Sequence, residues 1–222
     1  MEYRESMTRR TILYWLTLSP AVTVGWLAAL ASDSPTRAHA EARSAGKCLP
    51  TGADMEGPFY LPGAPHRAAL APPAEPGVRL IVRGRVVGPD CTTPVPGALL
   101  DLWQADANGE YHGATEQYRL RGRIRTSAGG AYEFLTVRPG PYRIGGRFRP
   151  AHIHFTVTRP GHQPLTSQLY FKGDPYLAPN DACGEMCKSD DPGRIIDLRR
   201  EEKMGAEFLG GTFDIVLKPA GA

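Results

Sequence analysis

Two histidines separated by one residue form the sequence feature with the clearest chemical meaning. His152 and His154 flank Ile153 at the start of the stretch HIHFTVT, which alternates between two faces. Side chains two residues apart in a β-strand point to the same face, so both imidazoles are expected to project together. Such a pair can bind one metal ion, or it can consist of two polar residues on a solvated strand face. The pair alone leaves both interpretations open.

Three further side chains nearby bear on that choice. Tyr111 follows an Asn-Gly turn, Tyr142 follows a Gly-Pro turn, and Arg149 lies three residues before His152. A phenol has a pKa near 10 and is normally a core or surface group, but binding to a strongly Lewis-acidic trivalent metal removes its proton. Two phenolate oxygens and two imidazoles suit Fe(III). This cluster holds no cysteine, which disfavours a structural zinc or copper thiolate site.

The elements that must position these residues are expected to be short strands. The 222 residues include 25 glycines and 21 prolines, which indicates many turns. Alternating apolar stretches predict strands at 78–87, 98–104, 132–137, 152–158, 166–171 and 212–217. A short helix is predicted at 195–204, and residues 43–77 read as an irregular arm. The pattern predicts an all-β fold: a single β-sandwich domain with an irregular N-terminal arm and long loops.

Composition limits the kinds of partner. Hydrophobic residues make up 41% of the chain and charged residues 22%, which is typical of a globular protein. The net charge of +3 is small, and the arginines are spread along the chain rather than gathered in a block. The charge therefore predicts no nucleic-acid partner.

The first 42 residues resemble a secretory signal. Arg9 and Arg10 precede an apolar stretch at 11–31, and small-x-small sites follow at 29–31 and 38–40. This layout predicts a signal peptide of the twin-arginine type at 1–42, followed by the folded domain at 43–222. The alternative is an uncleaved membrane anchor, because the apolar stretch is about long enough to span a bilayer. Pro20 and the small-residue sites favour cleavage, so we expect an exported protein with no stable membrane partner.

Four cysteines lie beyond this leader, at Cys48, Cys91, Cys183 and Cys187. An even number of cysteines in an exported chain predicts two disulfides, and the sequence leaves all three connectivities open. The spacing of Cys183 and Cys187 could also be half of a metal site. No histidine lies near them and no second close cysteine pair exists, which favours a disulfide.

Several longer motifs occur in a fixed order. They are EGPFY at 56–60, LDLWQADANGEY at 100–111, PGPY at 139–142, RPAHIHF at 149–155 and QLYFKGD at 168–174. Together they resemble the intradiol ring-cleavage dioxygenases, a family that includes protocatechuate 3,4-dioxygenases and catechol 1,2-dioxygenases. The resemblance covers residues 56–217, and the ordered set is far more specific than any one motif.

The resemblance implies a β-sandwich with a mononuclear Fe(III) site. Four residues match the family's metal ligands: Tyr111, Tyr142, His152 and His154. Arg149 and Gln168 match catalytic residues beside the metal, and Tyr142 matches a ligand that also acts as a base. The implied reaction cleaves a small-molecule catechol with O2 to a cis,cis-muconate-type dicarboxylate.

The sequence also departs from the family pattern. Ser127 stands where the family usually has Asp, and the segment after Tyr142 is short, with Ile144 near a family tryptophan. That segment lines the substrate pocket in the family, so the substrate-binding residues and the physiological catechol stay unassigned, as does the oligomeric state. Tyr118 is a rival ligand that lacks the Asn-Gly-x-Tyr spacing, and His112 is expected to be exposed.

Two other classes of function remain open at this point. A non-catalytic exported β-sandwich could serve as a binding module, because fold does not fix function. A zinc or copper hydrolase could use His152 and His154. Neither class requires two tyrosines and two histidines in motif order.

Overall fold

The computed structural model describes residues 48–113, 117–203 and 205–221, so the leader predicted at 1–42 lies outside the described residues. Within these ranges the chain forms twelve strands and two short 3-10 helices, η2 (Gly184–Met186) and η3 (Pro192–Arg194). The strands are β1 (Arg79–Val87), β2 (Leu99–Gln104), β3 (Arg121–Arg125), β4 (Ala131–Val137), β5 (Tyr142–Ile144), β6 (Arg147–Arg149), β7 (His152–Thr158), β8 (Leu165–Phe171), β9 (Ile195–Ile196), β10 (Arg199–Lys203), β11 (Ala206–Thr212) and β12 (Ile215–Val216). No helix in the described ranges is both long and apolar enough to cross a membrane.

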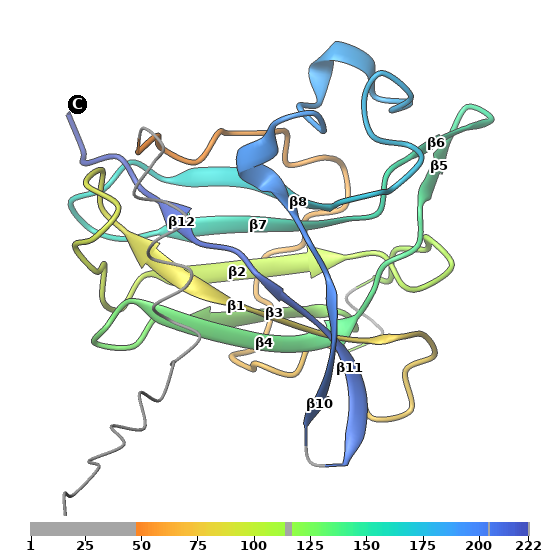
Figure 1. The fold of residues 1–222 in the computed structure, drawn as a ribbon, viewed down its shortest axis with the longest axis horizontal. Coiled ribbons are helices and arrows are strands. Elements are labelled where there is room, and N and C mark those ends of the chain that lie inside the picture. The colour runs from red at the N-terminus through yellow and green to blue at the C-terminus, as the bar shows by residue number, and fades with distance from the viewer. Residues whose placement is uncertain (1–47, 114–116, 204, 222) are drawn as a thin grey trace, which may run out of the picture. The chain divides into compact units, whose positions relative to one another are not determined.

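The strands form two five-stranded sheets, which confirms the predicted β-sandwich (Figure 1). One sheet has the order β10-β11-β1, with β4 antiparallel to β1 and β12 parallel to the end of β1. The other has the order β3-β2-β7-β8-β9. A separate two-stranded ribbon, β5–β6, leaves the sandwich just before β7.

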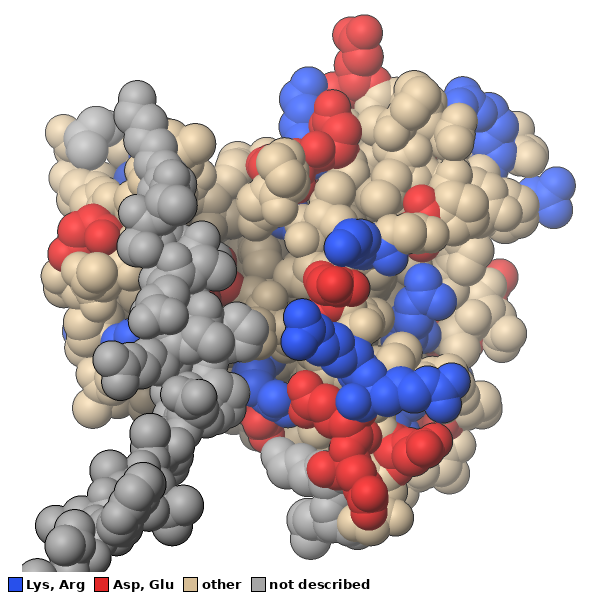
Figure 2. Space-filling model, in the orientation of Figure 1, with Lys and Arg blue, Asp and Glu red and all other residues tan. Residues whose placement is uncertain are grey.

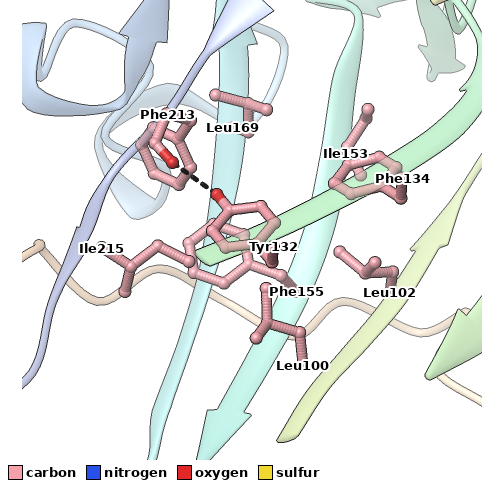
Figure 3. Close-up of a pocket in the computed structure, with 9 residues that line it drawn as sticks. All are labelled: Leu100, Leu102, Tyr132, Phe134, Ile153, Phe155, Leu169, Phe213 and Ile215. Carbon is pink, nitrogen blue, oxygen red and sulfur yellow. Dashed lines mark hydrogen bonds between the residues drawn. The ribbon is translucent and has the colours of Figure 1, made fainter. Parts of the chain in front are cut away.

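The hydrophobic core lies between the two sheets. A void of about 10 Å³ lies in this core. Figure 3 shows the side chains that line it: Leu100, Leu102, Tyr132, Phe134, Ile153, Phe155, Leu169, Phe213 and Ile215. The Tyr132 hydroxyl donates a hydrogen bond to the Phe213 carbonyl across this space. Because Ile153 and Phe155 of β7 face the core, the alternation of the strand turns His152 and His154 to the opposite face.

The irregular arm runs across that opposite face of the second sheet. It is covalently tied at its start by the Cys48–Cys91 disulfide. The Asp54 backbone N–H donates to the Thr166 carbonyl, and the Ser167 hydroxyl donates to the Gly52 carbonyl. Further along the arm, the Met55 carbonyl accepts a hydrogen bond from Gln168 Nε2 of β8, and Gly57 lies against the His154 ring of β7. The arm therefore covers both strands, which explains how two histidines outside the core are nevertheless buried.

The helix predicted at 195–204 is wrong. Residues 195–196 form β9 and residues 199–203 form β10, which pairs antiparallel with β11 at an edge of the first sheet. Met204 lies outside the described residues. Figure 2 shows acidic and basic side chains close together on this face, where Arg83 bonds Glu201 at 2.8 Å. Charged side chains protect an edge strand from pairing with other chains. In the sequence alone, the same run of charged residues is also typical of an exposed helix. The strand predicted at 212–217 is also broken, at 213–214 between β11 and β12.

A long loop joins β8 to β9 above the second sheet. It contains both 3-10 helices and the second disulfide, Cys183–Cys187. The two disulfides confirm the number predicted from the cysteine count and settle the connectivity that the sequence left open.

Candidate metal centre

The two histidines of β7 present nitrogen atoms to a common point. His152 Nδ1 lies 2.7 Å from the Pro150 carbonyl, so this nitrogen carries the hydrogen and Nε2 keeps a free lone pair. His152 Nε2 lies 3.1 Å from His154 Nε2. Both rings are almost fully buried. The sequence prediction that the pair projects together on one face is therefore confirmed.

Tyr111 brings an oxygen atom to the same point. Its hydroxyl oxygen lies 3.2 Å from His152 Nε2. Two neighbouring ligands of one metal ion, each bonded at ~2.1 Å and at a right angle, lie ~3 Å apart. The spacing of these two pairs of donor atoms is thus the spacing that a shared metal ion requires.

Tyr142 stands beside this group at the beginning of β5. Its ring lies edge-on to the Tyr111 ring, with 5.7 Å between the ring centroids. Phe59 of the arm stacks on Tyr111 at 4.2 Å and meets Tyr142 edge-on at 5.2 Å. Sequence reasoning missed the position of Phe59, although the EGPFY motif contains it. The arm thus packs against both candidate tyrosine ligands.

Burial sets the protonation states of the donor atoms. It raises the pKa of Tyr111, against the lowering effect of Arg149 and Arg121. Burial, followed by the positive charge of Arg149, lowers the pKa of His152 to about 3. Burial also holds the pKa of His154 far below its usual value, with His152 and Arg149 adding to the effect. Both imidazoles are therefore uncharged and can bind a metal ion through a nitrogen lone pair. The Tyr111 phenol, in contrast, keeps its proton until a metal cation displaces it.

Stacking, rather than hydrogen bonding, orients His154. Its ring lies parallel to the Trp103 ring, with 4.9 Å between the centroids. Gly57 lies against the same imidazole, where an added Cβ would be 3.4 Å from Cε1. His154 Nδ1 is buried without a hydrogen-bond partner among the described residues. Its Nε2 is therefore directed by the packing of Trp103 and the arm.

Asp106 organises the turn that carries Tyr111. Asp106 Oδ1 accepts hydrogen bonds from the backbone N–H groups of Asn108 and Glu110, at 2.8 and 3.0 Å. Its Oδ2 lies 3.1 Å from Nε2 of His112, whose side chain is only 13% exposed. The expectation that His112 is exposed is therefore wrong, because the neighbouring Asp106 carboxylate draws it inward.

The turns of the two tyrosines also pack on each other. The Gly140 N–H donates to the Asp106 carbonyl at 2.8 Å. A Cβ on Gly109, where φ is +88°, would lie 2.2 Å from the Pro141 carbonyl oxygen. Only a glycine permits this approach, so the Asn-Gly turn serves to bring the two tyrosine-bearing loops together.

Arg149 and Gln168 lie near the histidines, with Gln168 directly opposite His154 on β8. That they act in catalysis stays a prediction. Arg149 Nη2 donates to Gln168 Oε1 at 2.9 Å, and Gln168 Nε2 donates to the Met55 carbonyl of the arm at 2.9 Å. Arg149 Nε also bonds Asp181 at 3.2 Å. Arg149 therefore forms a buried ion pair with Asp181. Its Nη1 atom makes no hydrogen bond to any described residue.

Tyr118, the rival ligand, lies elsewhere, and the nearby carboxylate of Asp174 has a structural role. The Tyr118 hydroxyl donates to the Pro62 carbonyl at 3.0 Å. Asp174 accepts a hydrogen bond from the Ala151 N–H at 3.0 Å and so supports the start of β7. Among the described residues, no three His, Cys, Asp or Glu side chains are grouped so as to hold a metal ion. The donor set at this site thus depends on the tyrosines.

Comparison with known proteins places the chain in a family. Residues 55–219 match the family model described as "Dioxygenase". The chain belongs to the intradiol ring-cleavage dioxygenases. It is 38% identical to the chlorocatechol 1,2-dioxygenase of Rhodococcus opacus over 63% of each chain. It is 40% identical to the catechol 1,2-dioxygenase 2 of Acinetobacter lwoffii, over 55% of this chain and 52% of that one.

A solved structure shares the fold as well. The dioxygenase domain of a dioxygenase carbohydrate-binding protein fusion from Streptomyces sp. SirexAA-E is 38% identical and superposes with a TM-score of 0.65. The match covers 78% of this chain and all of that domain. This chain spans only about half to two thirds of the length of the two intradiol dioxygenases named above.

Proposed function

We propose that this protein is an exported intradiol dioxygenase that uses Fe(III) to cleave catecholic rings with O2 to cis,cis-muconate-type dicarboxylates. The observation that carries the proposal is that His152 Nε2 lies 3.2 Å from Tyr111 Oη and 3.1 Å from His154 Nε2, with Tyr142 alongside. Membership of the family supports the reaction class.

The donor chemistry of the site fits Fe(III). Tyr111, Tyr142, His152 and His154 would hold the ion, with two anionic oxygens stabilising its trivalent state. Bound there, Fe(III) would supply Lewis acidity toward the diol in its reaction with O2. The rings of Phe59 and Trp103 pack against Tyr111 and His154 and leave little room for water beside these two donors.

The protein's own groups handle protons and charge. The half-buried Tyr142 lies at the base of the β5–β6 ribbon. As a phenolate it would accept a proton from one catechol hydroxyl and become a neutral phenol. Arg149 Nη1 is directed by the bonds of Nε and Nη2, and it donates hydrogen bonds to substrate oxygens as negative charge develops on them. Gln168 acts by holding Arg149, because its Oε1 accepts from that guanidinium.

A spectrum and a product assay test this function. Purified protein loaded with Fe(III) is expected to be burgundy, since phenolate-to-iron charge transfer absorbs visible light, and to convert a simple catechol into a colourless muconate. A yellow semialdehyde product, or activity that needs Fe(II) and a reductant, would show extradiol cleavage and overturn the proposal. A colourless protein that binds Zn²⁺ and not iron would support the hydrolase alternative instead.

Export is the second part of the proposal. The arginine pair at Arg9-Arg10 and the apolar stretch at 11–31 support it, as do two disulfides, which persist in oxidising compartments. Replacing both arginines by lysine is expected to keep the chain in the cytoplasm, detected by cell fractionation. Unchanged export of that variant would contradict the twin-arginine assignment.

A further inference from the structure

The strand beside the histidine pair carries two side chains that face the same way. In the register of β7 and β8, Tyr170 lies opposite His152 and Gln168 lies opposite His154. Directly opposed residues in a sheet have neighbouring side chains on one face. Gln168 and Tyr170 are both completely buried. The metal ligands thus have a matching pair of polar partners on the next strand, and Tyr170 has no role in the reaction described so far.

The Tyr170 hydroxyl joins two buried groups of charges. On one side it lies 3.3 Å from Arg149 Nη2, which also donates to Gln168 Oε1. On the other side it lies 3.0 Å from Asp54 Oδ2. The Asp54 carboxylate is ion-paired with Arg194, and both of those side chains are fully removed from solvent. The Tyr170 hydroxyl thus lies within hydrogen-bond distance of both Arg149 and Asp54. Among the described residues, no other side chain of β8 does so.

The single hydrogen of this phenol has two acceptors within reach. Asp54 Oδ2 lies at 3.0 Å and Gln168 Oε1 at 2.9 Å from the hydroxyl oxygen. A carboxylate is the stronger acceptor because hydrogen bonds to ionised groups are roughly twice as strong as neutral ones. The hydrogen therefore points to Asp54, and the oxygen lone pairs face Arg149. With this orientation, Arg149 Nη2 is held between two neutral oxygens, those of Gln168 and Tyr170.

We infer that Tyr170 is a positioning residue, whose hydroxyl, oriented by Asp54 of the arm, fixes the Arg149 guanidinium beside the histidine pair. The inference rests on the proposed function, since the direction of Arg149 Nη1 matters for catalysis only if a catechol binds there. It also gives the arm a chemical role: Asp54 acts on the site through Tyr170 and Arg149. The Arg194 partner keeps Asp54 ionised inside the protein, so that it remains an acceptor.

The variant Tyr170→Phe removes the hydroxyl and keeps the ring. Groups that orient residues at a metal site typically change activity by 10–100-fold, and we expect kcat to fall about 10-fold while KM and iron content stay within two-fold of wild type. Tyr132→Phe is the matched control, because it also removes a buried tyrosine hydroxyl, but one that bonds the Phe213 carbonyl in the core. It should lower the unfolding temperature and leave kcat unchanged. A Tyr170→Phe enzyme with kcat within two-fold of wild type would overturn the inference.

A double-mutant comparison tests the route through Arg149. If the hydroxyl acts by holding Arg149, the pair Tyr170→Phe with Arg149→Lys should be no slower than Arg149→Lys alone. Losses that multiply would mean that Tyr170 acts independently, which contradicts the inference. If Tyr170→Phe is insoluble, Asp54→Asn serves instead, because it weakens the hydrogen-bond acceptor of Tyr170 and retains the phenol. We expect this variant also to lower kcat and to leave KM unchanged.

The iron-free protein separates this inference from the proposed function. In a crystal structure of iron-free Tyr170→Phe, Arg149 Nη2 should move beyond hydrogen-bond distance from Gln168 Oε1, which lies at 2.9 Å in wild type. A guanidinium that keeps its place would overturn the inference whatever the enzyme does. Wild-type protein that cleaves no catechol would defeat the proposed function, and the movement of Arg149 would still support the positioning role.

Discussion

Asp106 accepts a hydrogen bond from His112 at 3.1 Å, and the turn that these two residues close carries Tyr111 between them. The same carboxylate caps the turn through the N–H groups of Asn108 and Glu110. The buried carboxylate of Asp106 therefore holds the loop that carries Tyr111, a candidate metal ligand. Asp106 is not itself one of the candidate ligands.

The stability contributed by Asp106 should depend on pH. Burial would raise its pKa, but the hydrogen bonds from Glu110, Asn108 and His112 outweigh burial and lower the pKa below the ordinary 3.8. The folded state thus favours the ionised form. Its contribution is present above about pH 4 and is lost as the pH falls through the lowered pKa.

Comparison with Asp106→Asn measures this contribution. Hydrogen bonds to a charged group are worth about 1.5–3 kcal/mol, so at pH 7 the iron-free variant should be less stable by about 2 kcal/mol. Urea unfolding between pH 2 and 7 should show the difference shrinking below pH 4. A difference that is independent of pH would contradict the assigned lowering of the pKa.

Removing a ligand should remove the metal and leave the fold. We expect Tyr111→Phe and His154→Ala each to lose iron or turnover, because the sandwich supports the site from a core that neither residue enters. Metal analysis together with circular dichroism checks this. His66→Ala is a suitable control, since His66 is exposed. Full iron content and full turnover in either ligand variant would refute the assignment of that residue.

Tyr142→Phe should behave differently from Tyr111→Phe. Tyr142 is half-buried at the base of a two-stranded ribbon that leaves the sandwich. Replacing it should therefore disturb the positions of the other candidate ligands less than replacing Tyr111 does. The variant should keep substantial iron, shift the charge-transfer band and turn over slowly, because the proton acceptor is missing. Stopped-flow absorbance with a simple catechol measures the rate. Unchanged turnover would mean that this phenol does not act as the base.

The two disulfides should contribute unequally to stability. Cys48 and Cys91 are 43 residues apart, whereas Cys183 and Cys187 are four apart. In the loop-entropy model these bridges stabilise by about 4 and about 2 kcal/mol respectively. Paired Cys→Ala variants, compared by chemical unfolding, should reproduce this order and retain iron. Two or more free thiols in denatured, unreduced wild-type protein would disprove the pairing at once.

Much of the candidate site could be predicted from the sequence because its candidate ligands lie in local patterns. The HIH spacing on a strand and the Asn-Gly-x-Tyr turn both act over a few residues, and the structure brings His152, His154 and Tyr111 together. Tyr142 and Arg149 are paired with each other at the base of the β5–β6 ribbon, and both lie beside this group. That these residues bind iron stays a prediction.

The surroundings of the site could not be predicted, because they depend on contacts between distant segments. Phe59 stacks on Tyr111 from a segment with no regular structure, and Asp54 reaches Tyr170 from 116 positions away. No local periodicity marks such residues. Similarly, β10 looks helical from its charges, and only its pairing with β11 makes it a strand.

The Asp54–Arg194 ion pair also bears on when the site can form. Its two residues are 140 positions apart in the chain, and both are buried. Contacts between such distant residues form slowly, because a long loop must close before they stabilise anything. The segment that carries Asp54 is thus held next to Tyr170 by a residue that is synthesised much later. A nascent chain that ends before Arg194 already contains the four candidate ligands but lacks the ion pair that keeps Asp54 in place.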